Sequence, residues 1–225
     1  MKLILKAGFF ILVSFLLSSL NSRGAFAYPL TPQIPITIGG DMHLVKIEDM
    51  DNDGNNDLII TDGKVIRGFA VLFGNGNGTF SSPLEIGDND SYEWGINIAD
   101  MNNDGLNDVV VTNGALGSIQ ISLNTGARTF SPAVGYPIGN TIHSESSLST
   151  GDINGDGNID VVVAGSSSYA FHVFLGDGTG AISHFTDVAP NDPQDYHPDI
   201  ELFDFNGDSI LDVITSDNSS IGDIE

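Results

Sequence analysis

An acidic nonapeptide recurs four times along this chain and limits what the chain can fold into. The copies begin at Asp49, Asp100, Asp152 and Asp204, so their first residues lie 51, 52 and 52 positions apart. A fixed period of this length is typical of repeat architectures, in which one unit cannot bury its apolar face alone. The spacing therefore predicts a repeat protein with a unit of about 50 residues.

Positions 1, 3, 5 and 9 of every copy carry a carboxylate or carboxamide oxygen, as a hard cation such as Ca²⁺ requires for its roughly six to eight oxygen ligands. The predicted side-chain ligands are Asp49, Asp51, Asp53 and Asp57, then Asp100, Asn102, Asp104 and Asp108, then Asp152, Asn154, Asp156 and Asp160, and finally Asp204, Asn206, Asp208 and Asp212. By analogy with other calcium loops, position 7 adds a backbone carbonyl, from Asn55, Leu106, Asn158 and Ile210. We therefore expect up to four Ca²⁺ ions, one per repeat.

Position 6 distinguishes the four loops. It is Gly54, Gly105 and Gly157 in the first three copies, as expected where the chain turns sharply with positive φ, but Ser209 in the fourth. A serine in the left-handed region costs about 1–2 kcal/mol. The fourth site should be the weakest, whereas the first, with four carboxylates, should attract a cation most strongly.

Three other readings of the loops are less favoured. An EF-hand needs a Glu at position 12, where this chain has Ile60, Val111, Val163 and Thr215. Zinc is disfavoured by the all-oxygen ligand set and the absence of cysteine. Ordinary β-turns favour the same residues without a metal, but four copies in register favour a metal.

The segments between the loops predict strands. Alternating apolar residues enter each loop, β-branched runs such as Val109–Val111 leave it, and a second apolar strand follows at 69–73, 119–123 and 171–175. A turn at 74–80, 124–130 or 176–182 precedes a fourth strand. The predicted fold class is therefore all-β, with units the size of four-stranded propeller blades.

The four D-x-(D/N)-x-D-(G/S)-x-x-D loops and the turn Phe73–Phe80, with weaker echoes at 124–130 and 174–182, resemble the FG-GAP and VCBS-type repeats of integrin α-subunit heads and many secreted bacterial proteins. The resemblance covers roughly residues 41–225. It implies a β-propeller, commonly seven-bladed, with a structural Ca²⁺ in the hairpin between the first two strands of a blade.

The predicted blades lie near 41–91, 92–143 and 144–195, with an incomplete fourth at 196–225. Three full blades and a truncated fourth do not close a seven-bladed ring, and an open sheet edge is an aggregation hazard. Two explanations are open. The chain is a fragment of a longer protein, which we favour, or it completes a propeller by self-association.

Residues 1–27 predict a secretory signal peptide, with Lys2 and Lys6 before an apolar run and a small-residue site at Ala25–Ala27. A retained signal anchor is the alternative. Residues 28–40, which contain three prolines, predict an extended lead-in, and no later stretch is long and apolar enough to cross a membrane. We therefore expect a secreted protein, extracellular or periplasmic.

The formal net charge of −23 argues against nucleic acid as a partner, because phosphates would be repelled. His43, His143, His172, His184 and His197 share no register and show no metal-ligand spacing, so each is predicted to be a surface or strand histidine.

The sequence shows no catalytic motif, so we predict a non-catalytic module whose calcium-stabilised blades bind glycans or cell-surface proteins. Two alternatives remain. One is a propeller domain of a secreted polysaccharide-active enzyme, a lyase or dehydratase, and the other is a purely structural repeat region.

Overall fold

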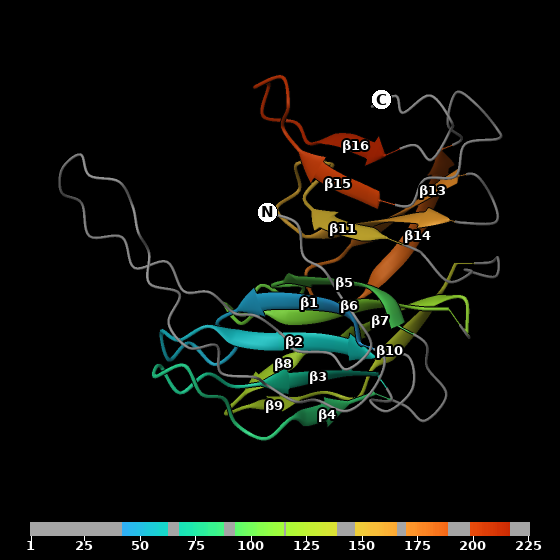
Figure 1. The fold of residues 1–225 in the computed structure, drawn as a ribbon. Coiled ribbons are helices and arrows are strands. Elements are labelled where there is room, and N and C mark those ends of the chain that lie inside the picture. Colours follow the sequence, from blue (N-terminus) through green and yellow to red (C-terminus); the bar gives the residue numbers. More distant parts are fainter. Residues whose placement is uncertain are drawn as a thin grey trace, which may run out of the picture.

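The computed structural model describes residues 42–62, 68–87, 93–114, 116–138, 147–165, 170–188 and 199–216. The predicted signal peptide and lead-in lie outside these ranges, as do His143 and His197. All regular secondary structure in the ranges is β-strand (Figure 1). They contain no helix that could span a membrane.

The strands form three four-stranded antiparallel sheets and two two-stranded sheets. The first sheet contains β1 (Met42–Glu48), β2 (Asp57–Asp62), β3 (Gly68–Leu72) and β4 (Leu84–Ile86). The second contains β5 (Glu93–Ala99), β6 (Asp108–Asn113), β7 (Ser118–Ser122) and β10 (Val134–Pro137), and the third β11 (Leu148–Gly151), β12 (Asp160–Gly165), β13 (Ala170–Gly176) and β14 (Ile182–Val188). The fourth pairs β15 (Asp199–Phe203) with β16 (Asp212–Ser216).

The predicted four-stranded meander is confirmed in each of the first three repeats, because the strands pair in chain order. The second repeat adds a small hairpin, β8 (Asn124–Gly126) with β9 (Thr129–Phe130), between its third and fourth strands. In the first repeat the same turn holds only an isolated bridge between Gly74 and Phe80. Each acidic nonapeptide joins the first two strands of its sheet, as expected.

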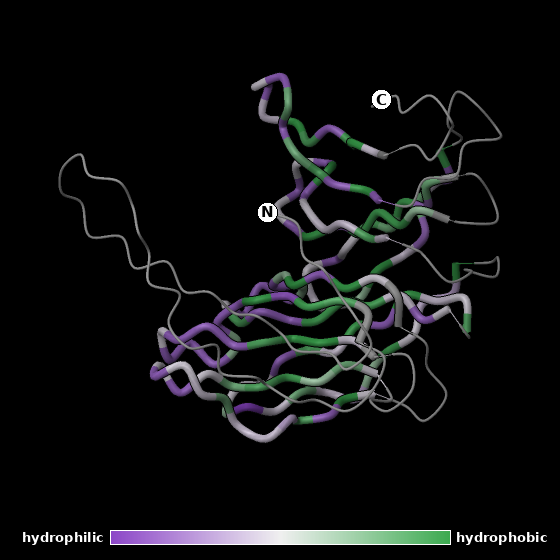
Figure 2. The backbone as a smooth tube through the Cα atoms, in the orientation of Figure 1, coloured by the Kyte–Doolittle hydropathy of each residue, from purple (hydrophilic) through white to green (hydrophobic). Residues whose placement is uncertain are grey.

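The central strands are buried along their whole length. Every residue of β3, β6 and β7 is buried, because a neighbouring sheet or repeat covers each face. Continuous β-branched runs such as Val109–Val111 are the sequence pattern of strands covered on both sides. In Figure 2 the hydrophobic residues accordingly follow the middle strands, and the hydrophilic residues gather in the loops.

The first strands of successive repeats lie side by side. β1 contacts β5, β5 contacts β11, and β11 contacts β15. Polar side chains bridge them, since Asn97 Nδ2 donates to Thr150 Oγ1 (3.1 Å) and the Leu202 backbone N–H donates to Ser149 Oγ (3.2 Å). In a β-propeller, four-stranded blades surround a central channel, and one strand of each blade lies beside that channel. The contacts between successive first strands agree with this arrangement.

A separate apolar core fills each space between sheets. The first and second sheets enclose Met50, Phe69 and Val109, and the second and third enclose Met101, Ile119 and Phe174. A smaller core between the third and fourth sheets contains Val162, Phe171 and Ile200. Met50 and Met101 occupy position 2 of the first and second loops, so each of these two loops inserts one apolar side chain into the core beside the next repeat. The blades therefore depend on their neighbours for burial.

Apolar side chains are exposed on the first and fourth sheets. Leu44, Val45 and Ile47 of β1 are exposed, and so are Phe203 and Phe205 near the fourth loop. Met50 and Met101, the equivalents of Phe205 in the first two loops, are buried by the following repeat. Closure of a ring by a second copy remains a prediction.

We expect Phe174→Ala to lower the free energy of unfolding by about 3–5 kcal/mol, because the ring is 1% exposed and its removal leaves a cavity between sheets. Phe185→Ala is the matched control. Phe185 lies on the adjoining strand β14 and is 64% exposed, so the substitution should change stability by less than about 0.5 kcal/mol. Urea unfolding measures both, and equal losses would contradict the assigned core.

Candidate metal centres

The first acidic loop wraps around the carboxylate of its position 1. Asp49 accepts hydrogen bonds from the backbone N–H groups of Asp53 (3.2 Å) and Gly54 (2.8 Å), and Asp53 accepts one from Asn55 N–H (2.8 Å). These bonds curl the chain so that its side-chain oxygens face inward.

The other three loops repeat this pattern. Position 1 accepts from the N–H groups of positions 5 and 6 at 2.8–3.1 Å, with Asp100, Asp152 and Asp204 as acceptors. The Gly157 N–H also lowers the pKa of the Asp152 carboxyl group. The two amide donors hold the position 1 carboxylate within its loop.

Two positions of each loop have left-handed backbone. At position 6, φ is 84° for Gly54, 82° for Gly105, 86° for Gly157 and 70° for Ser209. The prediction that the fourth loop holds a serine in the left-handed region is therefore confirmed. Position 4 is also left-handed, as Asn52, Asn103, Gly155 and Gly207. The sequence carried this second signal, because Asn and Gly tolerate positive φ best.

The position 9 aspartates of the first three loops are fully buried and fasten each loop to a second turn. Asp57 accepts from Met50 N–H (2.8 Å) and from Gly74 N–H (2.7 Å), 17 residues further on. Asp108 and Asp160 make the same pair of bonds in their repeats. Sequence reasoning assigned these aspartates to the metal alone and missed this clamp.

Burial changes the acidity of the clamping aspartates. Loss of hydration raises the pKa of Asp57, of Asp160 and most of all of Asp108, to about 6, against the lowering effect of the backbone N–H donors. The neighbouring loop carboxylates raise these pKa values further. A divalent cation bound in the loop would place positive charge beside these carboxylates and favour their ionised form.

Three carboxylates of the first loop lie close enough together to share one calcium ion. Carboxylate oxygens of Asp49, Asp51 and Asp57 all lie within 4.8 Å of one another. Two oxygens on one Ca²⁺, each about 2.3–2.6 Å from it, can be at most about 5 Å apart. In the second and third loops the position 3 amides of Asn102 and Asn154 instead donate to the position 5 carboxylate at 2.9 Å.

The first loop also touches the second repeat. Asn124 Nδ2 donates to Met50 O (2.6 Å), and Arg128 pairs with Asp51 (2.5 Å) and Asp53 (3.4 Å) while its guanidinium lies 4.6 Å from the Phe73 ring centroid. Arg128 therefore neutralises part of the first loop, which the prediction from carboxylate number did not consider.

The third repeat docks on the second loop in a related way. Gly180 N–H donates to Met101 O (3.1 Å), and Asn103 Nδ2 donates to Asn158 Oδ1 (3.1 Å). The first two candidate metal loops thus lie at the contacts between repeats, where a bound ion would influence both neighbours.

The sequence matches the FG-GAP-like repeat family over residues 49–111, 100–163 and 152–215. The chain belongs to this family. Each match runs from one acidic loop to the strand that follows the next, so the family unit joins two neighbouring blades. The resemblance inferred from the loops and turns is confirmed.

Solved structures of propeller-like fold are similar to this FG-GAP-like chain. One is a lectin of Agrocybe aegerita that specifically recognises non-reducing terminal N-acetylglucosamine, with a TM-score of 0.55, 22% identity, and coverage of 82% of this chain and 51% of the lectin. Another is BBS1N in complex with ARL6DN, with a TM-score of 0.52, 16% identity, and coverage of 84% of this chain and 56% of that one.

These likenesses show the fold alone, because both identities are low. This chain spans about half the length of each of the two proteins. No curated protein matches the sequence.

The raised pKa of Asp108 predicts a pH dependence of the calcium-free protein. Between about 4, the ordinary carboxyl value, and about 6, the folded chain keeps a proton that the unfolded chain has lost. The free energy of unfolding therefore falls as pH rises through this window. With excess chelator we expect a lower urea midpoint at pH 7 than at pH 5.

Surface repulsion acts in the same direction, and salt separates the two effects. In 1 M NaCl the Debye length is about 3 Å, so repulsion between exposed carboxylates is screened while the burial of Asp108 is not. The difference between pH 5 and pH 7 should persist in this salt. Equal midpoints there would contradict the assignment.

Proposed function

We propose that this chain is a secreted calcium-stabilised propeller module that binds glycans or surface proteins and performs no catalysis. The observation that carries the calcium part is the grouping of Asp49, Asp51 and Asp57 oxygens within 4.8 Å in the first loop. The same backbone wrapping in the other three loops supports one site per repeat.

Calcium would act mainly as a structural element. A site whose dissociation constant is one hundredth of the free Ca²⁺ concentration contributes about 2.7 kcal/mol to stability. Several such sites would rival the entire marginal stability of a domain. The absence of cysteine leaves no disulfide to take over this role.

Export through residues 1–27 is part of the proposal, because calcium loops fit a calcium-rich exterior. The leader pattern in the sequence supports it.

The acidic loops and the turns after the third strands meet at one end of each of the first three sheets, where Asp57, Asp108 and Asp160 accept hydrogen bonds from those turns (Figure 1). Calcium would make this end rigid, and rigid loops on a β-scaffold are common binding surfaces. Carboxylate and amide groups there could pair with sugar hydroxyls. The lectin with a similar fold makes glycans the first ligand class to test.

We expect millimolar Ca²⁺ to raise the melting temperature by several degrees over the value in excess chelator, because ion binding favours the folded state. Differential scanning calorimetry measures the shift. Mg²⁺ should give a smaller shift, since it demands a tighter octahedral shell.

The double variant Asp49→Asn/Asp53→Asn provides the matched control. It keeps the size of both side chains in the first loop, and it should reduce the calcium-induced shift without abolishing it. A melting temperature that is the same in calcium and in chelator would refute the proposed role of the ion.

Glycan binding should require calcium if the loops form the binding surface. We expect retention on a glycan array, with terminal N-acetylglucosamine as the first probe, in Ca²⁺ and loss of retention in chelator at a temperature where the calcium-free chain is still folded. If retention does not depend on calcium, the acidic loops do not form the glycan-binding surface. No retention on any glycan would favour a protein partner.

A further inference from the structure

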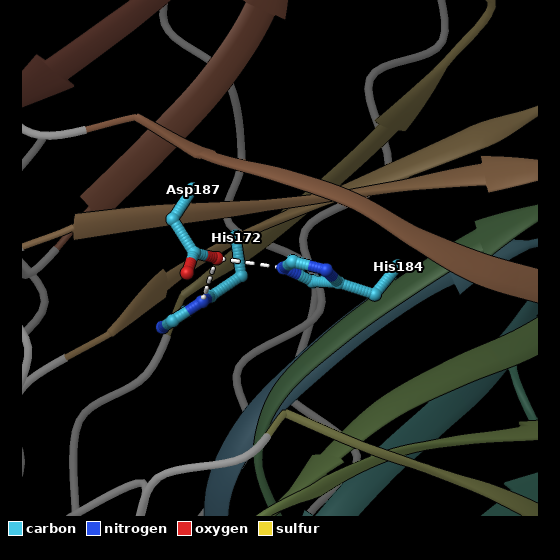
Figure 3. Close-up of side chains that lie close together, drawn as sticks. All are labelled: His172, His184 and Asp187. Atoms are coloured by element: carbon cyan, nitrogen blue, oxygen red, sulfur yellow. Dashed lines mark hydrogen bonds and ion pairs between the residues drawn. The ribbon is translucent and has the colours of Figure 1, made fainter.

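Two histidines and an aspartate converge on the third sheet, away from the acidic loops. His172 lies on β13, and His184 and Asp187 lie on β14. Asp187 Oδ1 is 2.7 Å from His172 Nδ1 and 2.7 Å from His184 Nε2, so both rings face one carboxylate oxygen (Figure 3). The three potential ligand atoms all lie within 4.8 Å of one another.

A β-bulge brings the three side chains together. His172 is paired with Asp187 and Phe174 with His184, so the register shifts by one residue and leaves Phe185 without a partner. In a regular strand His184 and Asp187, three positions apart, would point to opposite faces. The bulge places them on the same face, and bulges often re-aim side chains at functional sites.

Burial differs among the three side chains in a way that suits a ligand site. The His172 side chain is 2% exposed and is held within the sheet, whereas His184 and Asp187 are 45% and 54% exposed. The Phe174 ring meets the His184 ring edge to face at 5.3 Å. One ligand is thus fixed, the second is oriented, and the third can adjust, while solvent reaches the centre.

We propose that His172, His184 and Asp187 form a binding site for a borderline divalent metal ion of the zinc class. Imidazole nitrogen suits zinc and related transition metals, whereas Ca²⁺ takes oxygen ligands, so this site differs in chemistry from the acidic loops. Three protein ligands leave a fourth tetrahedral position for water or an exogenous ligand.

Only a small movement is needed to admit the ion. Neighbouring ligands of a tetrahedral zinc ion, with bonds of about 2.1 Å, lie about 3.4 Å apart. The nitrogen–oxygen distances of 2.7 Å must therefore open by roughly 0.7 Å. The exposed His184 and Asp187 can supply this movement by small side-chain rotations. The ion would replace the protons that now join the rings to Asp187.

Isothermal titration of Zn²⁺ into the full chain in saturating Ca²⁺ tests the site, because calcium keeps the acidic loops occupied. We expect one Zn²⁺ per chain. His184→Ala and Asp187→Asn should each weaken binding at least tenfold, because removal of even a hydrogen-bond partner of a metal ligand typically costs about 10–100-fold in affinity. Ser183→Ala, an exposed neighbour on β14, should bind as the parent does.

Cobalt gives a second readout that a merely structural cluster would not produce. Co²⁺ in a tetrahedral nitrogen and oxygen site has visible absorption bands, and these should be present in the parent and in Ser183→Ala and absent in His184→Ala. Circular dichroism checks that each variant is folded. The variant His184→Gln is used in place of a variant that is not folded. No saturable Zn²⁺ binding, or equal binding in parent and variants, would overturn the proposal.

Discussion

The hydrogen bonds of the buried aspartate at position 9 of the first three loops are the interaction on which the rest of the structure depends. Asp57, Asp108 and Asp160 lose their hydration and recover only part of it from two backbone N–H donors each. Burial of an ionised group is costly unless it is paired and hydrogen-bonded. The bonds nevertheless join the loop between the first two strands to the turn after the third, so one carboxylate organises the end of a blade.

The loops connect blades as well as strands. Position 2 inserts Met50 or Met101 into the core beside the next repeat, and Asn124 and Gly180 return hydrogen bonds from that repeat to the loop backbone. Stability in repeat proteins is approximately a sum of unit and nearest-neighbour terms. A cation in one loop would therefore affect both terms, because the loop belongs to its own blade and to the contact with the following one.

The chain carries two kinds of candidate metal site with different origins. The acidic loops use oxygen ligands from nine consecutive residues, and they recur with every repeat. The cluster of His172, His184 and Asp187 uses nitrogen and oxygen ligands from two adjacent strands and occurs in the third repeat alone among the described blades. Hard and borderline cations prefer these ligand sets respectively, so the two kinds of site need not compete.

The sequence by itself determined the period, the four-stranded unit and the geometry of the loops. The strands and loops are specified locally. Hydrophobic alternation predicts each strand, and Gly54 or Ser209 together with carboxylates two positions apart predicts the shape of each loop. Tertiary structure alone decided that Arg128 reaches Asp51, 77 positions away, and that Asp57 clamps Gly74. It also decided that His184 and Asp187 share a face. A single bulged residue reverses strand alternation, and no local pattern in the sequence reports the register of two paired strands.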